Sequence, residues 1–452
     1  MKKLTVLSLS VMMFVGSFAY ADIDNMDIGG DILLEYFFAK EFDLNDSPAT
    51  PDETDFLRSE IHLWFQADLD DNITARISLE ADRAFSHDSF GSVGGTNELD
   101  WDNFGDLEIF LEEAFIKIAD IWGSGFTLSA GRQFLNYGDN PNADDFNRWW
   151  GPGFIIADSA SYSPLLLTDL GSYEIDPFDA IVLSYETEQA RVDVIHARDV
   201  EDFYNNNLPG LDDDATMWAL YGSYFGIEGH QLDLYATYND ENMEWGSLSD
   251  FLPFDGERII VGGRAAGDLT EEVAYKAEVA YQFDNRNGVG MGPLEADGFG
   301  AQAGINYHPD VDRSPNIGIL YTFLQQDGVS PTGGFAAPYE GKTYGMIAEG
   351  IFKVLDPASF LSNMHVFNLN GGLLLADNVA WTADFYYFLL QDDVADEDEG
   401  GFEFDSQIDY QFNDNLVSFL GGGVFFPGDY AKTMYGGNDE AFFVRAGLKV
   451  NF

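Results

Sequence analysis

Six histidines are the side chains in this sequence best suited to proton transfer and to metal binding near neutral pH: His62, His87, His196, His230, His308 and His365. None of them lies in an H-E-x-x-H motif or beside a G-x-S-x-G motif, so neither a zinc-protease signature nor a nucleophile elbow is present. The pair His87-Asp88 could serve a hydrolase built on a membrane barrel, but a solvated loop position explains it better. We predict that the chain is not an enzyme.

Acidic residues dominate the charge, with 79 Asp and Glu against 21 Lys and Arg and a formal net charge of −58. Such an excess repels nucleic acid and other polyanions. The run Asp68-Leu69-Asp70-Asp71-Asn72 places carboxylates at alternate positions as calcium loops do, but it lacks the glycine and the terminal glutamate of an EF-hand. It predicts a tight turn. We expect no metal site and no cofactor, with Ca²⁺ bound in the longer acidic loops as the alternative left open.

A third group with chemical potential lies in and before the stretch 136–177. There Asn147-Arg148-Trp149-Trp150 joins aromatic rings that can stack on sugars to a guanidinium that can hold an acidic sugar through two hydrogen bonds. The candidate sugar-contact residues are Arg132, Tyr137, Arg148, Trp149 and Trp150. The alternative, which we favour, is that this long loop folds into the mouth of a barrel and its aromatic residues only pack there.

The elements that must position these residues are strands, because a two-residue alternation runs through the chain. From 402 to 412, apolar and aromatic residues hold most even positions, whereas Glu403, Asp405 and other polar residues hold the odd ones. The same alternation recurs over 57–69 and 273–284. Successive side chains of a strand point to opposite faces, so each segment has one apolar and one polar face. In an outer-membrane barrel these faces meet lipid and the lumen respectively.

The connections favour a barrel over a soluble sandwich. Short turns at 70–72, 188–189, 377–378 and 413–415 alternate with long loops such as 40–56, 136–177, 285–297, 327–363 and 392–401. Tight periplasmic turns and long outer loops are typical of barrels. Eighteen strands are predicted, at 31–39, 57–69, 73–85, 107–119, 125–135, 178–187, 190–199, 215–226, 229–240, 257–267, 272–284, 298–308, 315–326, 364–376, 378–391, 402–412, 415–426 and 441–452. We assign Lys342–Lys353 to a loop that could fold inward, with an extra strand as the alternative.

Both ends of the chain agree with an outer-membrane protein. Met1-Lys2-Lys3, an apolar run and Ala19-Tyr20-Ala21 form a secretory signal peptide, so we expect cleavage after Ala21 and a barrel over 22–452. No other stretch offers the ~20 apolar residues that a spanning helix needs, and only helices and closed barrels satisfy their backbone groups in lipid. The alternating final segment stops on Phe452, an ending typical of Gram-negative outer-membrane barrels.

Two stretches resemble the alginate-export family of outer-membrane barrels. They are Gly131-Arg132-Gln133-Phe134-Leu135-Asn136-Tyr137-Gly138-Asp139, and the last two hairpins from Asp409-Tyr410 through Asn413-Asp414-Asn415-Leu416 to Phe425-Phe426-Pro427-Gly428 and Phe452. Leu57-Arg58-Ser59 is similar to the family's second strand. The resemblance implies an eighteen-stranded, porin-like barrel that passes sugars or other solutes in either direction. It also implies an arginine-rich lumen that favours an anionic polysaccharide.

The charge of this chain departs from that family, so the position of each basic residue matters. The alternation assigns nine of them to the lumen: Arg58, Arg76, Lys117, Arg191, Arg258, Arg264, Lys276, Arg445 and Lys449. It assigns acids to the same face: Glu60, Asp68, Glu80, Asp233, Glu278, Asp384, Glu403, Asp405 and Asp409. These charges could pair across strands and stiffen the wall, or form a selective ring at a constriction.

We therefore expect an all-β antiparallel barrel in the outer membrane of a Gram-negative bacterium. It would be a monomer in contact with lipid and lipopolysaccharide. Its predicted function is passive transport of hydrophilic solutes, most simply anionic saccharides. A cation-preferring general porin and a non-conducting structural or attachment barrel are the alternatives.

Overall fold

The wall of the molecule is one closed antiparallel β-barrel of eighteen strands. The computed structural model describes residues 25–41, 44, 53–70, 72–86, 109–135, 137, 159–160, 175–198, 215–242, 254–288, 292–295, 297–325, 344–348, 363–394, 396–435 and 439–452. The wall strands are β1 (Asn25–Lys40), β2 (Glu53–Asp70), β3 (Ile73–Ser86), β4 (Phe110–Ile118), β5 (Phe126–Gln133), β8 (Phe178–Glu186), β9 (Ala190–Arg198), β10 (Ala215–Ile227), β11 (His230–Asn242), β12 (Phe254–Thr270), β13 (Val273–Gly288), β15 (Gly298–Tyr307), β16 (Asn316–Leu324), β17 (Met364–Ala376), β18 (Val379–Val394), β19 (Glu397–Asn413), β20 (Leu416–Pro427) and β21 (Ala441–Asn451). Each of them overlaps one predicted strand, so the predicted fold class is confirmed.

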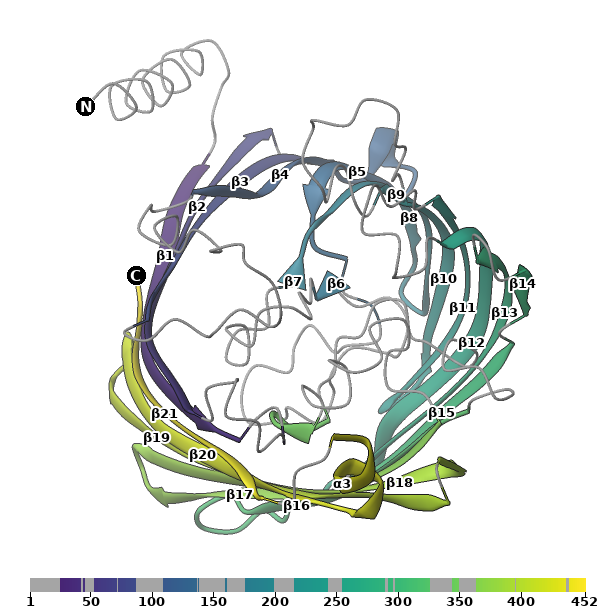
Figure 1. Cartoon of the computed structure of the whole chain (residues 1–452). Helices are drawn as coiled ribbons and strands as arrows, with labels where there is room; N and C mark the ends of the chain where they lie inside the picture. Colours follow the sequence, from purple (N-terminus) through teal and green to yellow (C-terminus); the bar gives the residue numbers. More distant parts are fainter. Residues whose placement is uncertain are drawn as a thin grey trace, which may run out of the picture.

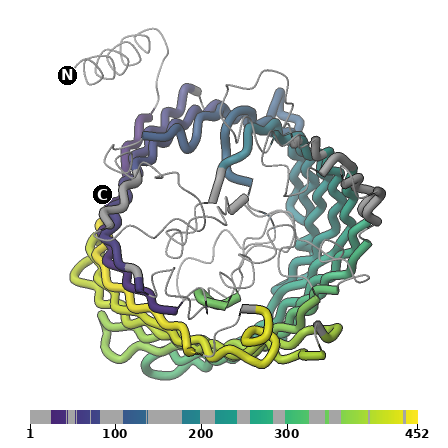
Figure 2. Tube along the Cα trace, in the orientation of Figure 1, coloured from purple at the N-terminus to yellow at the C-terminus, as the bar shows by residue number. Residues whose placement is uncertain are grey.

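The barrel closes because its first and last strands pair. β1 and β21 run antiparallel from Asp31 opposite Asn451 to Lys40 opposite Phe442, so the first and last strands lie side by side in the wall (Figures 1 and 2). The Phe452 backbone adds a reciprocal pair of hydrogen bonds to Gly30, both 2.9 Å. Closure gives every wall strand a neighbour on each side, so the sheet has no edge strand, which is the condition for placing strands in lipid.

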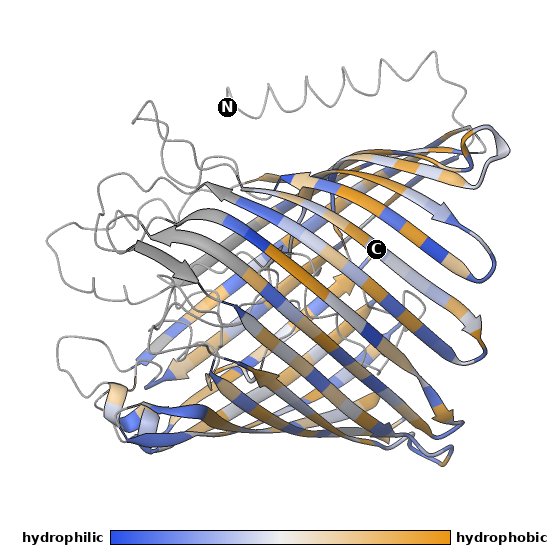
Figure 3. Ribbon diagram, turned by 90° about the vertical axis from the view of Figure 1, so that its right-hand side faces the viewer, coloured by the Kyte–Doolittle hydropathy of each residue, from blue (hydrophilic) through white to orange (hydrophobic). Residues whose placement is uncertain are grey.

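Burial along the strands follows the predicted alternation. In β8, Phe178, Ala180 and Val182 are buried inside the barrel, whereas Ile181 and Leu183 point outward and are exposed. Colouring by hydropathy shows the same change from residue to residue along many strands (Figure 3). No described helix is long and apolar enough to cross a membrane.

Short connections gather at one end of the barrel, which we call the short-turn end (Figure 3). They include residues 187–189 between β8 and β9 and 377–378 between β17 and β18. The other end, from which the chain makes its longest connections, is the long-loop end.

Two predicted long loops are largely strand. β18 and β19 are separated only by residues 395–396, and β13 continues to Gly288 and pairs with the short strand β14 (Gly292–Glu295). The prediction was wrong there because these extensions carry polar residues on both faces. The backbone hydrogen-bond ladder continues there without the alternation of apolar and polar residues that predicts a strand. Smaller elements are η3 (Ile121–Gly123), the β6–β7 pair (Ser159–Ala160, Ile175–Asp176) and α3 (Asp429–Tyr435).

Candidate functional site in the barrel lumen

The nine basic residues assigned to the lumen all have inward positions in the register of the strands. Residues directly opposite one another on antiparallel strands share a face. Arg264, for example, lies opposite Asp233 on one side and Glu278 on the other, and Lys449 lies opposite Val417 and Leu33. The same register brings the assigned acids to this face, so the lumen carries charges of both signs.

Most of these basic side chains meet a carboxylate at hydrogen-bond or ion-pair distance. Arg264 Nη1 lies 3.0 Å from Asp233 Oδ2, and both side chains are buried. Arg76 Nε lies 2.6 Å from Glu113, and Lys449 Nζ lies 3.4 Å from Asp31. Further pairs join Arg58 to Glu60 (2.9 Å) and Arg191 to Asp193 (2.9 Å). The bases therefore form an ion-paired lining, not a track of isolated positive charges.

Two lumenal arginines also lie over aromatic rings. The Arg76 guanidinium carbon is 5.1 Å from the centre of the Trp64 ring, and that of Arg445 is 5.4 Å from the centre of Phe419. Arg445 donates a 2.6 Å hydrogen bond to Gln407 and lies 3.8 Å from Glu35. These contacts hold each guanidinium beside an inward-facing aromatic ring of the wall.

Acidic side chains outnumber basic ones on the described inner face. The acids there include Asp31, Glu35, Glu60, Asp68, Glu80, Glu112, Glu113, Asp193, Asp233, Glu278, Asp384, Glu403, Asp405 and Asp409. Several are held by neutral amides: Asn368 donates to Asp384 (3.3 Å) and Gln407 to Asp409 (2.7 Å). The field of the lumen is therefore negative near β18 and β19.

A loop segment enters the barrel and is held by one wall carboxylate. Glu403 Oε1 accepts hydrogen bonds from the backbone N–H groups of Met346 (2.7 Å) and Ile347 (2.8 Å), and Oε2 accepts one from Ala348 (2.7 Å). Glu403, Ile347 and Ala348 are fully buried. The described part of 342–353 thus forms an inward loop and not an additional strand, as predicted. Gly345 permits it with a φ of 81°, where a Cβ would lie 2.6 Å from Glu403 Oε2.

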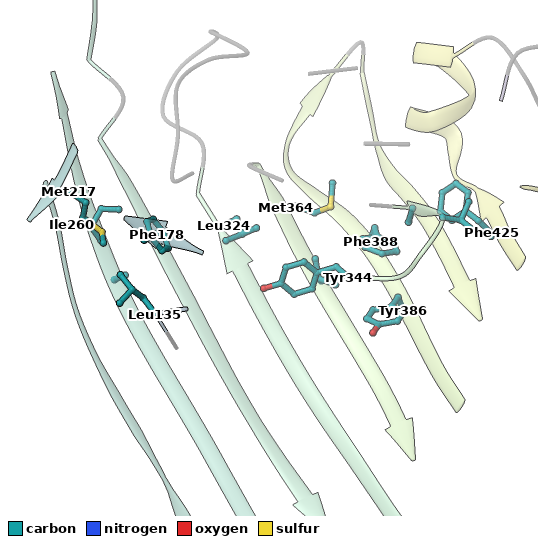
Figure 4. Close-up of a cluster of buried hydrophobic side chains, with 14 of the residues drawn as sticks. Leu135, Phe178, Met217, Ile260, Leu324, Tyr344, Met364, Tyr386, Phe388 and Phe425 are labelled. Atoms are coloured by element: carbon teal, nitrogen blue, oxygen red, sulfur yellow. The ribbon is translucent and has the colours of Figure 1, made fainter. Parts of the chain in front are cut away.

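Towards the long-loop end the inner face becomes apolar. Phe37, Phe178, Ile195, Met217, Ile260, Leu324, Met364, Phe388, Phe425 and Phe443, which we call the mouth ring, are buried inward residues of the wall. Leu44, Leu135, Tyr344 and Ile347, which lie outside the strands, are buried in the same cluster (Figure 4). Loop residues therefore pack against the wall at this level and narrow the barrel.

The two described sugar-contact candidates, Arg132 and Tyr137, point to opposite sides of the wall. Tyr137 packs inside against Tyr221, with ring centres 4.7 Å apart, and burial near Asp193 raises the pKa of its hydroxyl. Arg132 lies opposite Asp179, its Nη1 3.8 Å from that carboxylate, on the outer face shared with Ile181. Gly131 and Gln133 take the inner positions. Arg148, Trp149 and Trp150 lie outside the described residues.

A cluster of carboxylates surrounds His62, and it was not predicted from the sequence. His62 Nδ1 is 3.3 Å from Asp31, and its Nε2 is 3.4 Å from Glu60, 3.7 Å from Glu80 and 3.9 Å from Glu112. The alternation places Glu60 and His62 on one face, which was a usable signal. The partners come from β1, β3 and β4, and only the register between strands brings them together.

No protein-family model matches the chain, and no curated protein matches it significantly in sequence. Solved structures do match. The crystal structure of Pseudomonas aeruginosa OccK9 (OpdG) superposes with a TM-score of 0.57 at 12% identity, covering 96% of this chain and 100% of that one. Acinetobacter baumannii OccAB2 gives 0.56 at 12% identity over 96% and 99%, and P. aeruginosa OccK5 (OpdH) gives 0.52 at 8% over 96% and 99%. The neighbours are porins of the Occ/OprD family, so the fold is that of an eighteen-stranded outer-membrane porin. A specific likeness to the alginate-export family is not part of this match.

Proposed function

We propose that the chain forms a passive channel for small hydrophilic solutes through a bacterial outer membrane. The observation that carries this proposal is the opposition of the two faces of one closed wall: apolar outside, ionic within. The outward side chains include Ile181, Leu234 and Ile319, which are 52%, 74% and 63% exposed when no lipid is present. A continuous apolar band of this kind is unstable in water at about 25 cal/mol per Å² and stable in a bilayer.

An aqueous interior is the companion requirement. The side chains of Lys449, Arg191 and Arg76 keep 46%, 43% and 30% of their surface accessible although they point into the barrel. Ionised groups avoid a dry interior unless they are completely paired, so partly accessible charges favour water below the mouth ring. Partly accessible charges would be unfavourable inside a filled, non-conducting attachment barrel.

For selectivity, the excess of lumenal acids favours cations and neutral solutes over anions. Arginines and lysines paired at about 3 Å contribute little net positive field, because each is cancelled by its carboxylate. Charges at a constriction set ion preference. The acidic side chain of Asp384, on the inner face of β18, is therefore expected to contribute most.

As a second candidate we keep a channel for anionic saccharides of the alginate type. The observation favouring it is the seating of Arg76 over Trp64 and Arg445 over Phe419. A guanidinium next to an aromatic face can bind an acidic sugar, with the ring stacked and the carboxylate held by two hydrogen bonds.

The experiment that tests both candidates is conductance of the purified protein in planar bilayers, with the reversal potential measured across a salt gradient. We expect discrete channels that prefer cations. Channels that prefer anions, and that oligouronates block in the wild type but not in Arg76→Ala or Arg445→Ala, would transfer the assignment to the second candidate. Failure to conduct, in protein shown to be folded by its heat-modifiable migration, would refute the channel.

The same proposal places the chain in the outer membrane as a monomer, after removal of residues 1–21, with its apolar face against lipid and lipopolysaccharide. Membrane fractionation and N-terminal sequencing of the mature protein test this. Recovery in the soluble periplasmic fraction, or an N-terminus other than Asp22, would contradict it.

A further inference from the structure

The imidazole of His62 is surrounded by more carboxylates than its two nitrogens can serve. Nδ1 lies 3.3 Å from Asp31, and Nε2 is directed to a group of three carboxylates: Glu60 at 3.4 Å, Glu80 at 3.7 Å and Glu112 at 3.9 Å. Nε2 carries at most one proton and can donate one good hydrogen bond. The remaining carboxylates at this nitrogen need another positive partner.

Regular strand pairing brings some of these side chains together, and a β-bulge brings in another. His62 on β2 lies opposite Asp31 on β1 and opposite Glu80 on β3, so ordinary register brings three of the groups together. Glu112 reaches the cluster through a bulge, because the pairing of β3 with β4 shifts between Ser78–Glu113 and Leu79–Leu111. A regular strand would place Glu112 and Glu113 on opposite faces. Instead, Ser78 donates to Glu112 while Arg76 pairs with Glu113, so both point inward.

The charges around His62 do not balance with the described protein groups. Lys449 lies 3.4 Å from Asp31, and Arg58 lies 2.9 Å from Glu60. Among the described residues, Glu80 and Glu112 have no basic side chain within ion-pair distance except His62 itself. Two carboxylates are thus held beside one imidazole, partly shielded from water, in a position where a compact divalent cation would neutralise them.

The distances suit such an ion. In a tetrahedral site with metal–ligand bonds of about 2.0–2.1 Å, the ligand atoms are separated by about 3.3 Å. His62 Nε2 is 3.7 and 3.9 Å from the two carboxylate oxygens, and the donor atoms of His62, Glu80 and Glu112 lie within 4.8 Å of one another. Binding would therefore draw each of these two oxygens about half an ångström closer to Nε2. Asp31 would orient the imidazole through Nδ1, the usual support of a metal-bound histidine.

We propose that His62, Glu80 and Glu112 bind one divalent transition-metal ion on the lumenal wall, with Asp31 as a positioning residue. Imidazole nitrogen combined with carboxylate oxygen suits zinc and similar first-row ions better than Ca²⁺ or Mg²⁺, which prefer all-oxygen sites. Three protein ligands leave a position open to water or to a passing solute. The bound ion would thus place a positive charge at one position on an otherwise acidic lumenal wall, and it could exchange with ions in solution.

The test is titration of the chelator-treated, detergent-solubilised full-length protein with Zn²⁺ by calorimetry, in excess Ca²⁺ to saturate the acidic loops. The wild type is expected to show one tight site per chain. His62→Gln and, independently, Glu112→Gln should abolish it, and Asp31→Asn should weaken it about 10–100-fold. The matched control is His365→Gln, because His365 lies on the outer face against Tyr321 and is outside the cluster. All variants are first checked for heat-modifiable migration.

Each result decides the proposal. Tight binding that survives in His365→Gln and is lost in the other two variants supports it. Absence of a tight site in the wild type overturns it and leaves His62 as a protonated partner of the acids. Binding unchanged in folded His62→Gln or Glu112→Gln also overturns it. Because the readout is binding in detergent, failure of the channel proposal in bilayers would not affect this outcome.

Discussion

The mouth ring lies on the same strands and the same inner face as the ion-paired lining formed by the lumenal bases and acids, which we call the ionic surface. The two regions have opposite chemistry. On β9 the inward residue Ile195 lies one step nearer the long-loop end than Asp193, and on β12 Ile260 stands in the same relation to Arg264, two inward positions further along. Ile195 and Ile260 are covered by packed side chains, whereas Asp193 and Arg264 are held by ion pairs. The inner face of this barrel is therefore apolar where loop side chains pack against the mouth ring, and it carries most of its ion pairs nearer the short-turn end.

The largest effect is expected where these two regions meet, at Glu403. Glu403→Ala removes three hydrogen bonds to a charged acceptor, each worth about 1.5–3 kcal/mol, and leaves three buried N–H groups without partners. The segment 344–348 should detach from the wall. Single-channel conductance is expected to increase, and proteases should cleave this segment faster.

Asp409→Asn is the matched control, since Asp409 faces the same lumen from the same strand and its oxygen binds Gln407 and no loop backbone. Unchanged conductance in Glu403→Ala would mean that the inward segment does not narrow the pore.

A substitution within the mouth ring should act on stability more than on selectivity. Phe388→Ala leaves a cavity at a fully buried position between Tyr386 and Phe425. It should cost about 3–5 kcal/mol in the free energy of unfolding, which denaturant titration in detergent can measure. Ion preference should be unchanged.

The comparison is Ile181→Ala on the outer face, where detergent or lipid fills the space that the side chain vacates. If Ile181→Ala costs as much as Phe388→Ala, the interior of the mouth is not packed more tightly than the lipid-facing surface.

The smallest effect is expected from Lys449, and a comparison with the buried Arg264 tests how the cost of breaking an ion pair depends on its exposure to water. Lys449→Gln removes a partly exposed partner of Asp31 and should change the unfolding free energy by no more than about 1 kcal/mol. Arg264→Gln leaves Asp233 buried without its cation and should cost about 3–5 kcal/mol. Both should raise cation preference in reversal-potential measurements. Equal stability losses would indicate that the Lys449–Asp31 and Arg264–Asp233 pairs are equally shielded from water.

Much of this architecture could be predicted from the amino-acid sequence because the alternation of polar and apolar residues is local. It located all eighteen wall strands, the inward face of each, and the loop around Tyr344. It failed where local information is weak. The polar extensions of β13, β18 and β19 carry no alternation, and they were therefore predicted to be loops.

The amino-acid sequence by itself determined which side chains of the regular strand segments face the lumen, since a strand's period of two follows from backbone geometry alone. Which of those side chains touch was decided only by the tertiary structure, through the register between strands and one bulge in β4. The His62 cluster shows the reason: its donors come from four strands, and a one-residue change of register would move any of them to the lipid face. Membership of the lumen is a local property of the chain, whereas a binding site in it is a property of the closed barrel.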